Sequence, residues 1–226
     1  MSLKRLKLVV FDLDGTIIDS VPDLAVAADL AAKELGFPGV KEEQARDYVG
    51  NGADILIARV LSQSLQIDPN LSAELRKEAR HLFDDFYEAT GHKRSQLYDG
   101  VQETVKQLFE AGYKLAVVTN KPSRFVPEIL QQHGLIDYFS DIIGGDCFET
   151  RKPDPIALNW LLDKYQLTAE QMLMVGDSKN DILAAKNAGC ESFGLTYGYN
   201  HGEPLELSKP TYITDNFSDL LKVVLK

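Results

Sequence analysis

The chain has 226 residues, of which 44% are hydrophobic and 26% are charged, a composition typical of a soluble globular protein with a sizeable core. Its formal charge of −10 argues against binding to nucleic acid or to an anionic membrane, and no apolar run approaches the ~20 residues that cross a bilayer. We therefore expect a cytoplasmic protein without nucleic-acid or membrane partners, in which any site for an anion is built from local positive charge.

The first predicted element is a strand at residues 8–11, where an apolar run bounded by an acid indicates burial on both faces. Ligands of open α/β sheets bind at the carboxyl ends of strands, so Asp12 and Asp14 are candidate site residues. Gly15 allows the backbone to turn tightly or to approach a ligand, and Thr16 adds a hydroxyl. Taken alone, Asp-x-Asp-Gly is equally compatible with a solvated turn, so the interpretation depends on the rest of the chain.

Helical patterning dominates residues 20–90. A first helix is predicted from Ser20, as its N-cap, to Gly36, with Asp23 placed to interact favourably with the helix dipole. Three further helices are predicted at 41–48, 53–66 and 72–90. The polar segment 92–96 is predicted to be a return linker.

From residue 100 onward, helices and strands alternate. Helices are predicted at 101–111, 122–132, 155–165, 182–188 and 218–225. Strands are predicted at 115–119, 141–144, 172–176, 192–196 and 212–213. This alternation is typical of parallel strands joined by right-handed crossovers. We therefore predict an α/β fold with a parallel-sheet core formed by residues 1–18 and 92–226, and an all-helical cap, residues 19–91, inserted over the strand ends.

Cysteine and histidine usage argues against other kinds of site. Cys147 and Cys190 lie far apart in a sequence with no export signal, so we expect buried free thiols rather than a disulfide. The four histidines are scattered without ligand spacing. Any metal is therefore expected to have oxygen ligands.

Polar residues follow the predicted strands, and in a parallel sheet these strand ends share one edge. The residues concerned are Asp12, Thr119, Asn120, Lys121, Lys152, Asp177 and Ser178. Each has a simpler interpretation alone: Thr119 and Asn120 could cap a helix, Lys152 could be solvated, and Asp177 could be a helix N-terminal acid. Their convergence at one edge indicates a catalytic site.

Carboxylates dominate the predicted edge. Its four acids and one lysine, which are Asp12, Asp14, Asp177, Asp181 and Lys152, give a formal charge of −3. Such crowding raises carboxylate pKa values or requires a cation, and hard oxygen ligands favour Mg²⁺, which would leave −1. Asp177 is the expected metal ligand, while Ser178 and Asp181 are expected to hold the metal's waters and Lys152.

The residue types at this edge suit phosphoryl transfer. Asp12 can attack phosphorus to give an aspartyl-phosphate that water hydrolyses. Asp14, two residues further on, can protonate the leaving oxygen and then deprotonate the attacking water. Thr119 and the Asn120 amide can donate hydrogen bonds to phosphoryl oxygens, and Lys152 can offset the charge of the transition state.

These segments together resemble the four motifs of the haloacid dehalogenase-like hydrolase superfamily. The matching segments are Asp12-Leu13-Asp14-Gly15-Thr16, Thr119-Asn120, Lys152-Pro153 and Gly176-Asp177-Ser178-x-x-Asp181. The resemblance implies a Rossmann-like core with an inserted helical cap, dependence on Mg²⁺ and an aspartyl-phosphate intermediate. It assigns Asp12 as the nucleophile and Asp14 as the acid and base. It makes the backbone carbonyl of Asp14 and the Asp177 side chain metal ligands, and Thr119 and Lys152 phosphate-binding residues. To these the residues themselves add Asp12 as a metal ligand and Gly15, Thr16 and Asn120 as phosphate-binding candidates.

The cap contains one candidate substrate loop. Gly50-Asn51-Gly52 opens the helix predicted from Ala53, so the free N–H groups of its first turn could bind a substrate carboxylate, although a simple turn is the alternative. Over nearly its full length, the chain resembles bacterial members of this superfamily that act on 2-phosphoglycolate, so 2-phosphoglycolate is the expected substrate. The protein is expected to be a monomer or a weak homodimer. The alternatives are a phosphatase or pyrophosphatase for another small phosphate ester, a phosphoglucomutase-like isomerase and a non-catalytic phosphate-binding module.

Overall fold

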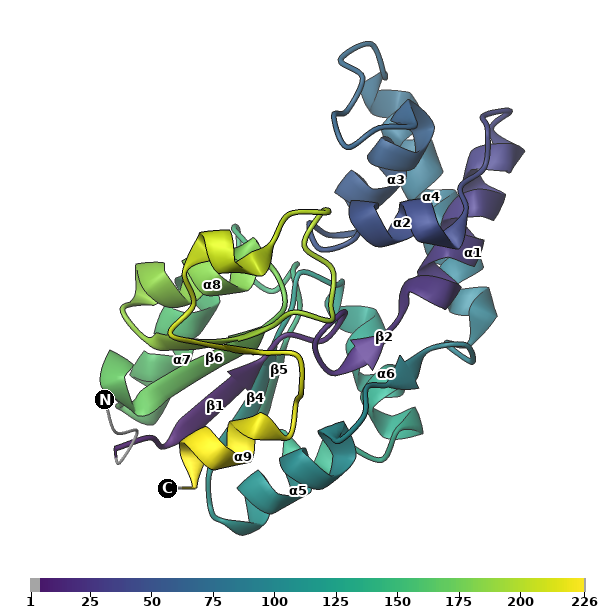
Figure 1. The fold of residues 1–226 in the computed structure, drawn as a ribbon. Helices are drawn as coiled ribbons and strands as arrows, with labels where there is room; N and C mark the ends of the chain where they lie inside the picture. Colours follow the sequence, from purple (N-terminus) through teal and green to yellow (C-terminus); the bar gives the residue numbers. More distant parts are fainter. Residues whose placement is uncertain (1–4, 226) are drawn as a thin grey trace.

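The computed structural model describes residues 5–225 and contains a six-stranded parallel sheet beside a separate group of helices (Figure 1). Residues 1–4 and 226 of the predicted core lie outside the described range. The strands are β1 (Leu8–Phe11), β4 (Lys114–Val118), β5 (Asp141–Ile143), β6 (Met172–Gly176), β7 (Glu191–Leu195) and β8 (Tyr212–Thr214). Their order is β5-β4-β1-β6-β7-β8. Strands β4 and β5 are added on one side of β1, and β6, β7 and β8 follow on the other side. This change of direction creates a crevice at the carboxyl end of β1.

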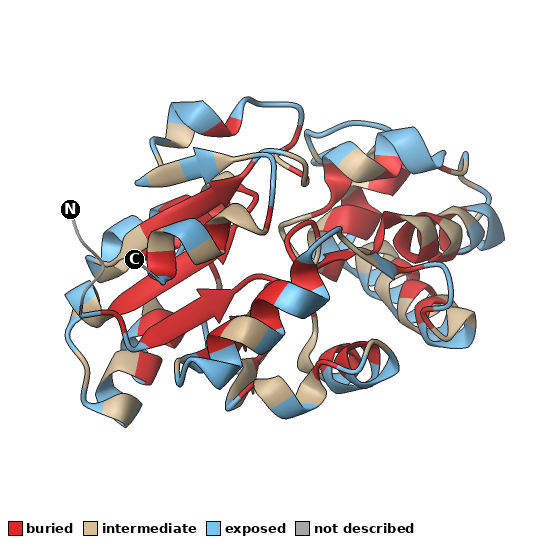
Figure 2. Cartoon of the chain, turned by 60° about the horizontal axis from the view of Figure 1, so that its bottom comes forward, coloured by how far each residue is buried: buried red, intermediate tan, exposed pale blue. Residues whose placement is uncertain are grey.

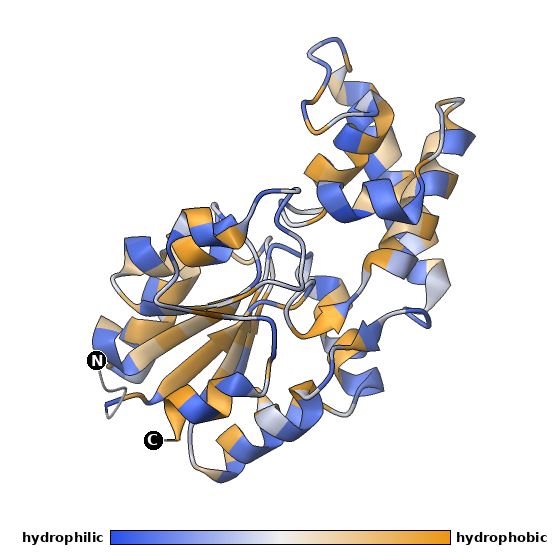
Figure 3. Ribbon diagram, viewed as in Figure 1, coloured by the Kyte–Doolittle hydropathy of each residue, from blue (hydrophilic) through white to orange (hydrophobic). Residues whose placement is uncertain are grey.

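Both faces of the sheet are covered, as the uninterrupted apolar sequence of β1 predicted. Val9 and Phe11 pack in one hydrophobic layer, and Leu8 and Val10 pack in the other. The first layer includes residues of α5 (Val101–Glu110), α6 (Val126–Gln132) and α9 (Asp219–Val224), and the second those of α7 (Ile156–Tyr165) and α8 (Lys179–Ala188). Figure 2 shows the buried strands beneath partly exposed helices, and Figure 3 shows that the same strands are hydrophobic.

Four helices form the cap beyond the carboxyl edge of the sheet (Figure 1). They are α1 (Val21–Glu34), α2 (Glu42–Tyr48), α3 (Ala53–Ser62) and α4 (Ala73–Thr90). Helix α1 packs against the other three. The helix predicted at 53–66 ends early because Gln63 adopts the left-handed conformation (φ 52°) as its C-cap. All four helices lie within 19–91, although these domain limits themselves remain a prediction.

A short antiparallel ribbon that the sequence did not predict joins the core to the cap. Its strands are β2 (Ile18–Asp19) and β3 (Gln96–Leu97), so the two chain crossings are held together. Asp23 is buried beside the ribbon, where its Oδ2 accepts hydrogen bonds from Ser95 N (2.7 Å), Ser95 Oγ (2.6 Å) and Arg94 N (3.0 Å). Asp23 therefore fixes the return linker in addition to lying in the first turn of α1.

Two local predictions hold only in part. Ser20 is the N-cap residue of α1, as predicted, but its side chain makes no capping hydrogen bond, because its hydroxyl donates to Asp14 Oδ1 at 2.6 Å. Cys147 is exposed rather than buried and Cys190 is partly buried, although both are free thiols. Among residues 5–225, no helix is long and apolar enough to cross a membrane.

Candidate active site

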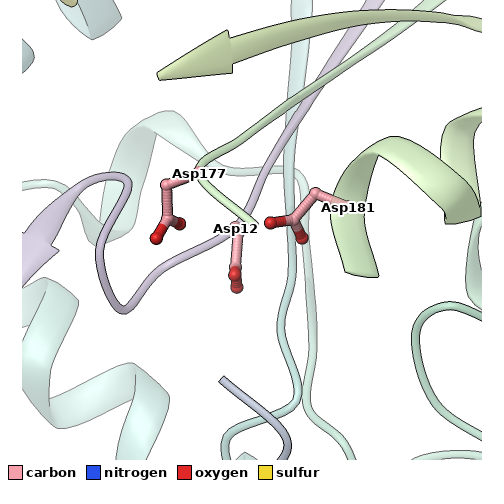
Figure 4. A group of neighbouring side chains, drawn as sticks. All are labelled: Asp12, Asp177 and Asp181. Atoms are coloured by element: carbon pink, nitrogen blue, oxygen red, sulfur yellow. The ribbon is translucent and has the colours of Figure 1, made fainter. Parts of the chain in front are cut away.

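Three aspartates meet at the carboxyl edge of the sheet (Figure 4). Asp12 follows β1, Asp177 follows β6 and Asp181 lies in the first turn of α8. One carboxylate oxygen from each lies within 4.8 Å of the other two. Burial, together with the neighbouring Asp181, raises the pKa of Asp12 to about 7, although Lys152 acts in the opposite direction. The pKa of Asp177 is raised well above its usual range by burial and then by Asp181 and Asp12.

Lys152 offsets part of this negative charge. Its Nζ lies 3.0 Å from Asp12 Oδ1 and 2.6 Å from Asp181 Oδ1, and its side chain is only 2% exposed. Burial alone would lower the pKa of Lys152, but the two carboxylates raise it above its usual range. The alternative of a solvated lysine is therefore wrong. Ser178 holds the other oxygen of Asp181, to which it donates from its N (3.0 Å) and its Oγ (2.8 Å).

Two hydrogen bonds and two glycines fix the carboxylate of Asp177. Its Oδ1 accepts from Thr16 Oγ1 and its Oδ2 from Tyr199 N, both at 2.6 Å. A Cβ at either Gly15 or Gly198 would lie 2.2 Å from Asp177 Oδ2. Gly15 thus permits close approach to Asp177 as well as a positive φ of 87°, and the Thr16 hydroxyl faces Asp177.

Asp14 lies apart from the aspartate cluster. Its carboxylate accepts from Lys121 Nζ at 3.0 and 3.1 Å and from Ser20 Oγ at 2.6 Å. Lys121 Nζ also lies 4.6 Å from the centre of the Tyr87 ring. Burial would lower the pKa of Lys121, but Asp14 and Tyr87 more than offset that effect and raise it. The sequence placed Lys121 at this strand end without a role, because a lysine after a strand is usually solvated.

The residues after β4 link the core to the cap loop. Thr119 Oγ1 accepts a hydrogen bond from Lys121 N at 3.2 Å. Asn120 Nδ2 donates to the carbonyl oxygens of Gly50 and Lys152, both at 3.1 Å. Asn180 Nδ2 donates to the same Gly50 oxygen at 3.1 Å. The Asn120 amide is thus occupied by backbone carbonyls, and Asn180 is a cap contact that the sequence did not indicate.

The cap loop closes a small cavity over the strand ends. Gly52, with a φ of 87°, precedes the first residue of α3. Gly50 and Gly52 line a cavity of about 30 Å³ together with core residues that include Asp12, Asp14, Thr119 and Lys121. Asn51 instead lines an outer groove. Core and cap therefore both contribute to the walls around the reactive groups.

The donor set of the cluster fits a hard divalent cation. Carboxylate oxygens converge, and a single lysine leaves them with excess negative charge and raised pKa values. Asp181 pairs directly with the Lys152 ammonium at 2.6 Å, whereas the Asp177 carboxylate accepts only from the neutral Thr16 hydroxyl and Tyr199 N–H. Asp177 and the neighbouring Asp12 are therefore the side chains that would hold the ion.

The fold and this site together define the class of the protein. The family model described as "Haloacid dehalogenase-like hydrolase" matches residues 9–195. The chain belongs to this family and is a hydrolase, which confirms the resemblance seen in its motifs. It is 68% identical over 223 residues to the phosphoglycolate phosphatase of Vibrio cholerae, covering 99% of each chain. It is 43% identical over 222 residues to that of Photorhabdus laumondii, covering 98% of this chain and 94% of the relative. The crystal structure of a predicted phosphoglycolate phosphatase from Haemophilus somnus superposes with a TM-score of 0.90 at 39% identity, covering 97% of this chain and 98% of that one.

Proposed function

We propose that this hydrolase is a Mg²⁺-dependent phosphatase that converts 2-phosphoglycolate to glycolate and inorganic phosphate. The observation that carries the proposal is the Asp12 carboxylate beside Lys152, at the edge of a cavity that the cap closes. Full-length similarity to proteins named phosphoglycolate phosphatase supports the choice of substrate.

Asp12 is the proposed nucleophile. Its Oδ1 accepts from Leu13 N (2.7 Å) and lies 3.0 Å from Lys152 Nζ, whereas its Oδ2 accepts no hydrogen bond from the described residues. Oδ2 is therefore free to attack phosphorus and form the aspartyl-phosphate. Lys152 offsets the charge that develops on the phosphoryl oxygens, and the Thr119 hydroxyl can donate to one of them.

Asp14 is the proposed acid and base. Its protonated carboxyl gives a proton to the leaving glycolate oxygen as the bond from phosphorus to that oxygen breaks. The Asp14 carboxylate then removes a proton from a water that attacks phosphorus, which releases phosphate and restores Asp12. A bound Mg²⁺, held by Asp12, Asp177 and the carbonyl of Asp14, would supply positive charge to the phosphate and the carboxylates.

Release of inorganic phosphate from 2-phosphoglycolate tests the proposal. We expect turnover that depends on Mg²⁺, is abolished by Asp12→Asn and is severely slowed by Asp14→Asn. Equal and negligible rates for wild type and Asp12→Asn would instead indicate a non-catalytic phosphate-binding module. Transfer of phosphate to a second sugar without its release to water would indicate an isomerase.

The Gly50-Asn51-Gly52 loop is the proposed source of substrate preference. Gly50 and Gly52 have φ values of 111° and 87° that disfavour other residues, and a Cβ at Gly52 would lie 3.2 Å from the Asn120 carbonyl oxygen. Larger residues at Gly50 and Gly52 should therefore move the N-terminus of α3 and lower turnover of 2-phosphoglycolate more than turnover of an aryl phosphate. Equal, unchanged turnover of both substrates would rule out this role.

A further inference from the structure

Lys121 is the sole cation among the described residues that line the cavity between core and cap. Its side chain is 2% exposed, and its Nζ lies 3.0 Å from Asp14 Oδ1 and 4.6 Å from the centre of the Tyr87 ring. Apart from the strand-end residues Asp12, Asp14, Thr119 and Asn120, the wall of the cavity is mainly apolar and includes Phe83 and Phe125. A second anionic group of a bound substrate would therefore find one ammonium group in this cavity.

The proposed chemistry uses the other buried lysine but not Lys121. Lys152 is committed to Asp12 and Asp181, on the side where the phosphoryl group would lie. Lys121, by contrast, holds Asp14, which also accepts from Ser20. An Asp14 carboxylate held by these partners is not free to exchange a proton with a leaving group. Another anionic group must replace the Asp14 carboxylate at Lys121 before Asp14 can take part in the reaction.

We propose that Lys121 determines substrate specificity by binding the substrate carboxylate in place of Asp14. The freed Asp14 carboxylate then takes up a proton from solvent water and acts as the acid. This inference rests on the proposed function, because it requires a phosphate ester that carries a carboxylate. In 2-phosphoglycolate, one methylene group separates the ester oxygen from the carboxylate. Thr119 and Lys121 line the same cavity and are two residues apart, which places groups for both ends of such a molecule on one strand end.

The exchange costs little at Lys121 because one carboxylate partner replaces another. A buried ammonium group that loses its partner is strongly destabilised, so Lys121 opposes any step that leaves it unpaired. A carboxylated ester avoids this cost, because its own carboxylate pairs with Lys121 as Asp14 leaves. An ester without a carboxylate must free Asp14 at the expense of an unpaired lysine. The pairing of Lys121 with a substrate carboxylate therefore both binds carboxylated phosphate esters and frees Asp14 to act on them.

The test compares 2-phosphoglycolate with 2-hydroxyethyl phosphate, in which a hydroxymethyl group replaces the carboxylate. We expect wild type to prefer 2-phosphoglycolate in kcat/KM, and Lys121→Met and Lys121→Gln to reduce that preference by about 10- to 100-fold, as expected for loss of a charge-assisted hydrogen bond. Lys121→Arg should retain more of the preference than Lys121→Gln. Lys222→Met, which removes an exposed lysine on α9, is the matched control.

Parallel losses on both substrates would show a purely structural role for Lys121 and overturn the inference, as would an unchanged preference in both uncharged variants. Lys121→Gln and Lys121→Arg can still hydrogen-bond Asp14, which keeps the test valid if Lys121→Met does not fold. Failure of the proposed function would look different. In that case the wild type itself would show no preference for 2-phosphoglycolate.

Discussion

Replacing Lys152 by methionine would remove the cation that pairs with Asp12 and Asp181 in the aspartate cluster while keeping a side chain of similar length. Lys152 Nζ lies 3.0 Å from Asp12 and 2.6 Å from Asp181, and both the lysine and Asp181 side chains are essentially buried. Loss of one partner of a buried ion pair costs about 3–5 kcal/mol. In a chain of this size each kcal/mol lowers Tm by ~2–4 °C, so we expect a decrease of roughly 6–20 °C in metal-free protein.

Thermal unfolding in EDTA, followed by circular dichroism, measures this effect. The matched control is Lys222→Met, because Lys222 Nζ also lies 2.6 Å from its aspartate partner, but with side chains that are 73% and 31% exposed. That exposed pair is screened by solvent and contributes little to stability. The double variant Lys152→Met/Asp181→Asn should recover part of the loss, since it removes one uncompensated carboxylate. A Tm for Lys152→Met within 2 °C of the control would refute the reasoning.

Three further predictions concern the metal ligands and the linker. Gly198→Ala places a Cβ 2.2 Å from Asp177 Oδ2, so isothermal calorimetry should show Mg²⁺ affinity lower by about 10- to 100-fold; unchanged affinity would contradict the packing argument. Asp23→Ala removes the acceptor of three hydrogen bonds, two of them buried, and urea unfolding should show a loss of about 2–4 kcal/mol that Asp23→Asn partly avoids. Burial raises the pKa of Asp12 from 3.8 to about 7. Between about pH 4 and 7, the metal-free folded protein therefore keeps a proton on Asp12 that the unfolded chain has released. The free energy of unfolding should decrease progressively as pH rises through this range. Asp12→Asn should flatten that dependence of Tm in EDTA, and Mg²⁺ should raise the Tm of wild type more at pH 8 than at pH 5.5.

The sheet and the convergence of its strand ends were predictable from local sequence. Residues 8–11 and 172–176 are apolar at nearly every position, and their short length and bounding polar residues favour a strand covered on both faces over a buried helix. Because parallel strands share a carboxyl edge, the order of the predicted strands was enough to predict that Asp12, Lys152 and Asp177 lie close together. The structure confirms the parallel fold and brings these three side chains together.

The partners of the polar side chains were not predictable. Asn120 binds the carbonyl of Gly50, 70 residues away, and Lys121 binds Asp14, 107 residues away. A polar side chain after a strand can hydrogen-bond a ligand or a neighbouring protein group equally well. Which partner it binds depends on the residues that lie beside it in the folded chain. The ribbon of β2 and β3 was missed because strands of two residues are too short to show periodicity.

That ribbon has an architectural consequence for the helical insert. Paired strands lie about 5 Å apart, so the insert leaves the sheet domain and re-enters it at almost the same point. An insert whose ends adjoin can be exchanged for another one of different size without moving a strand of the main sheet. Grafting the cap of a relative onto this ribbon should therefore transplant the contacts that the cap loop makes with a ligand, while the reaction chemistry and the Lys121 ammonium stay with the recipient.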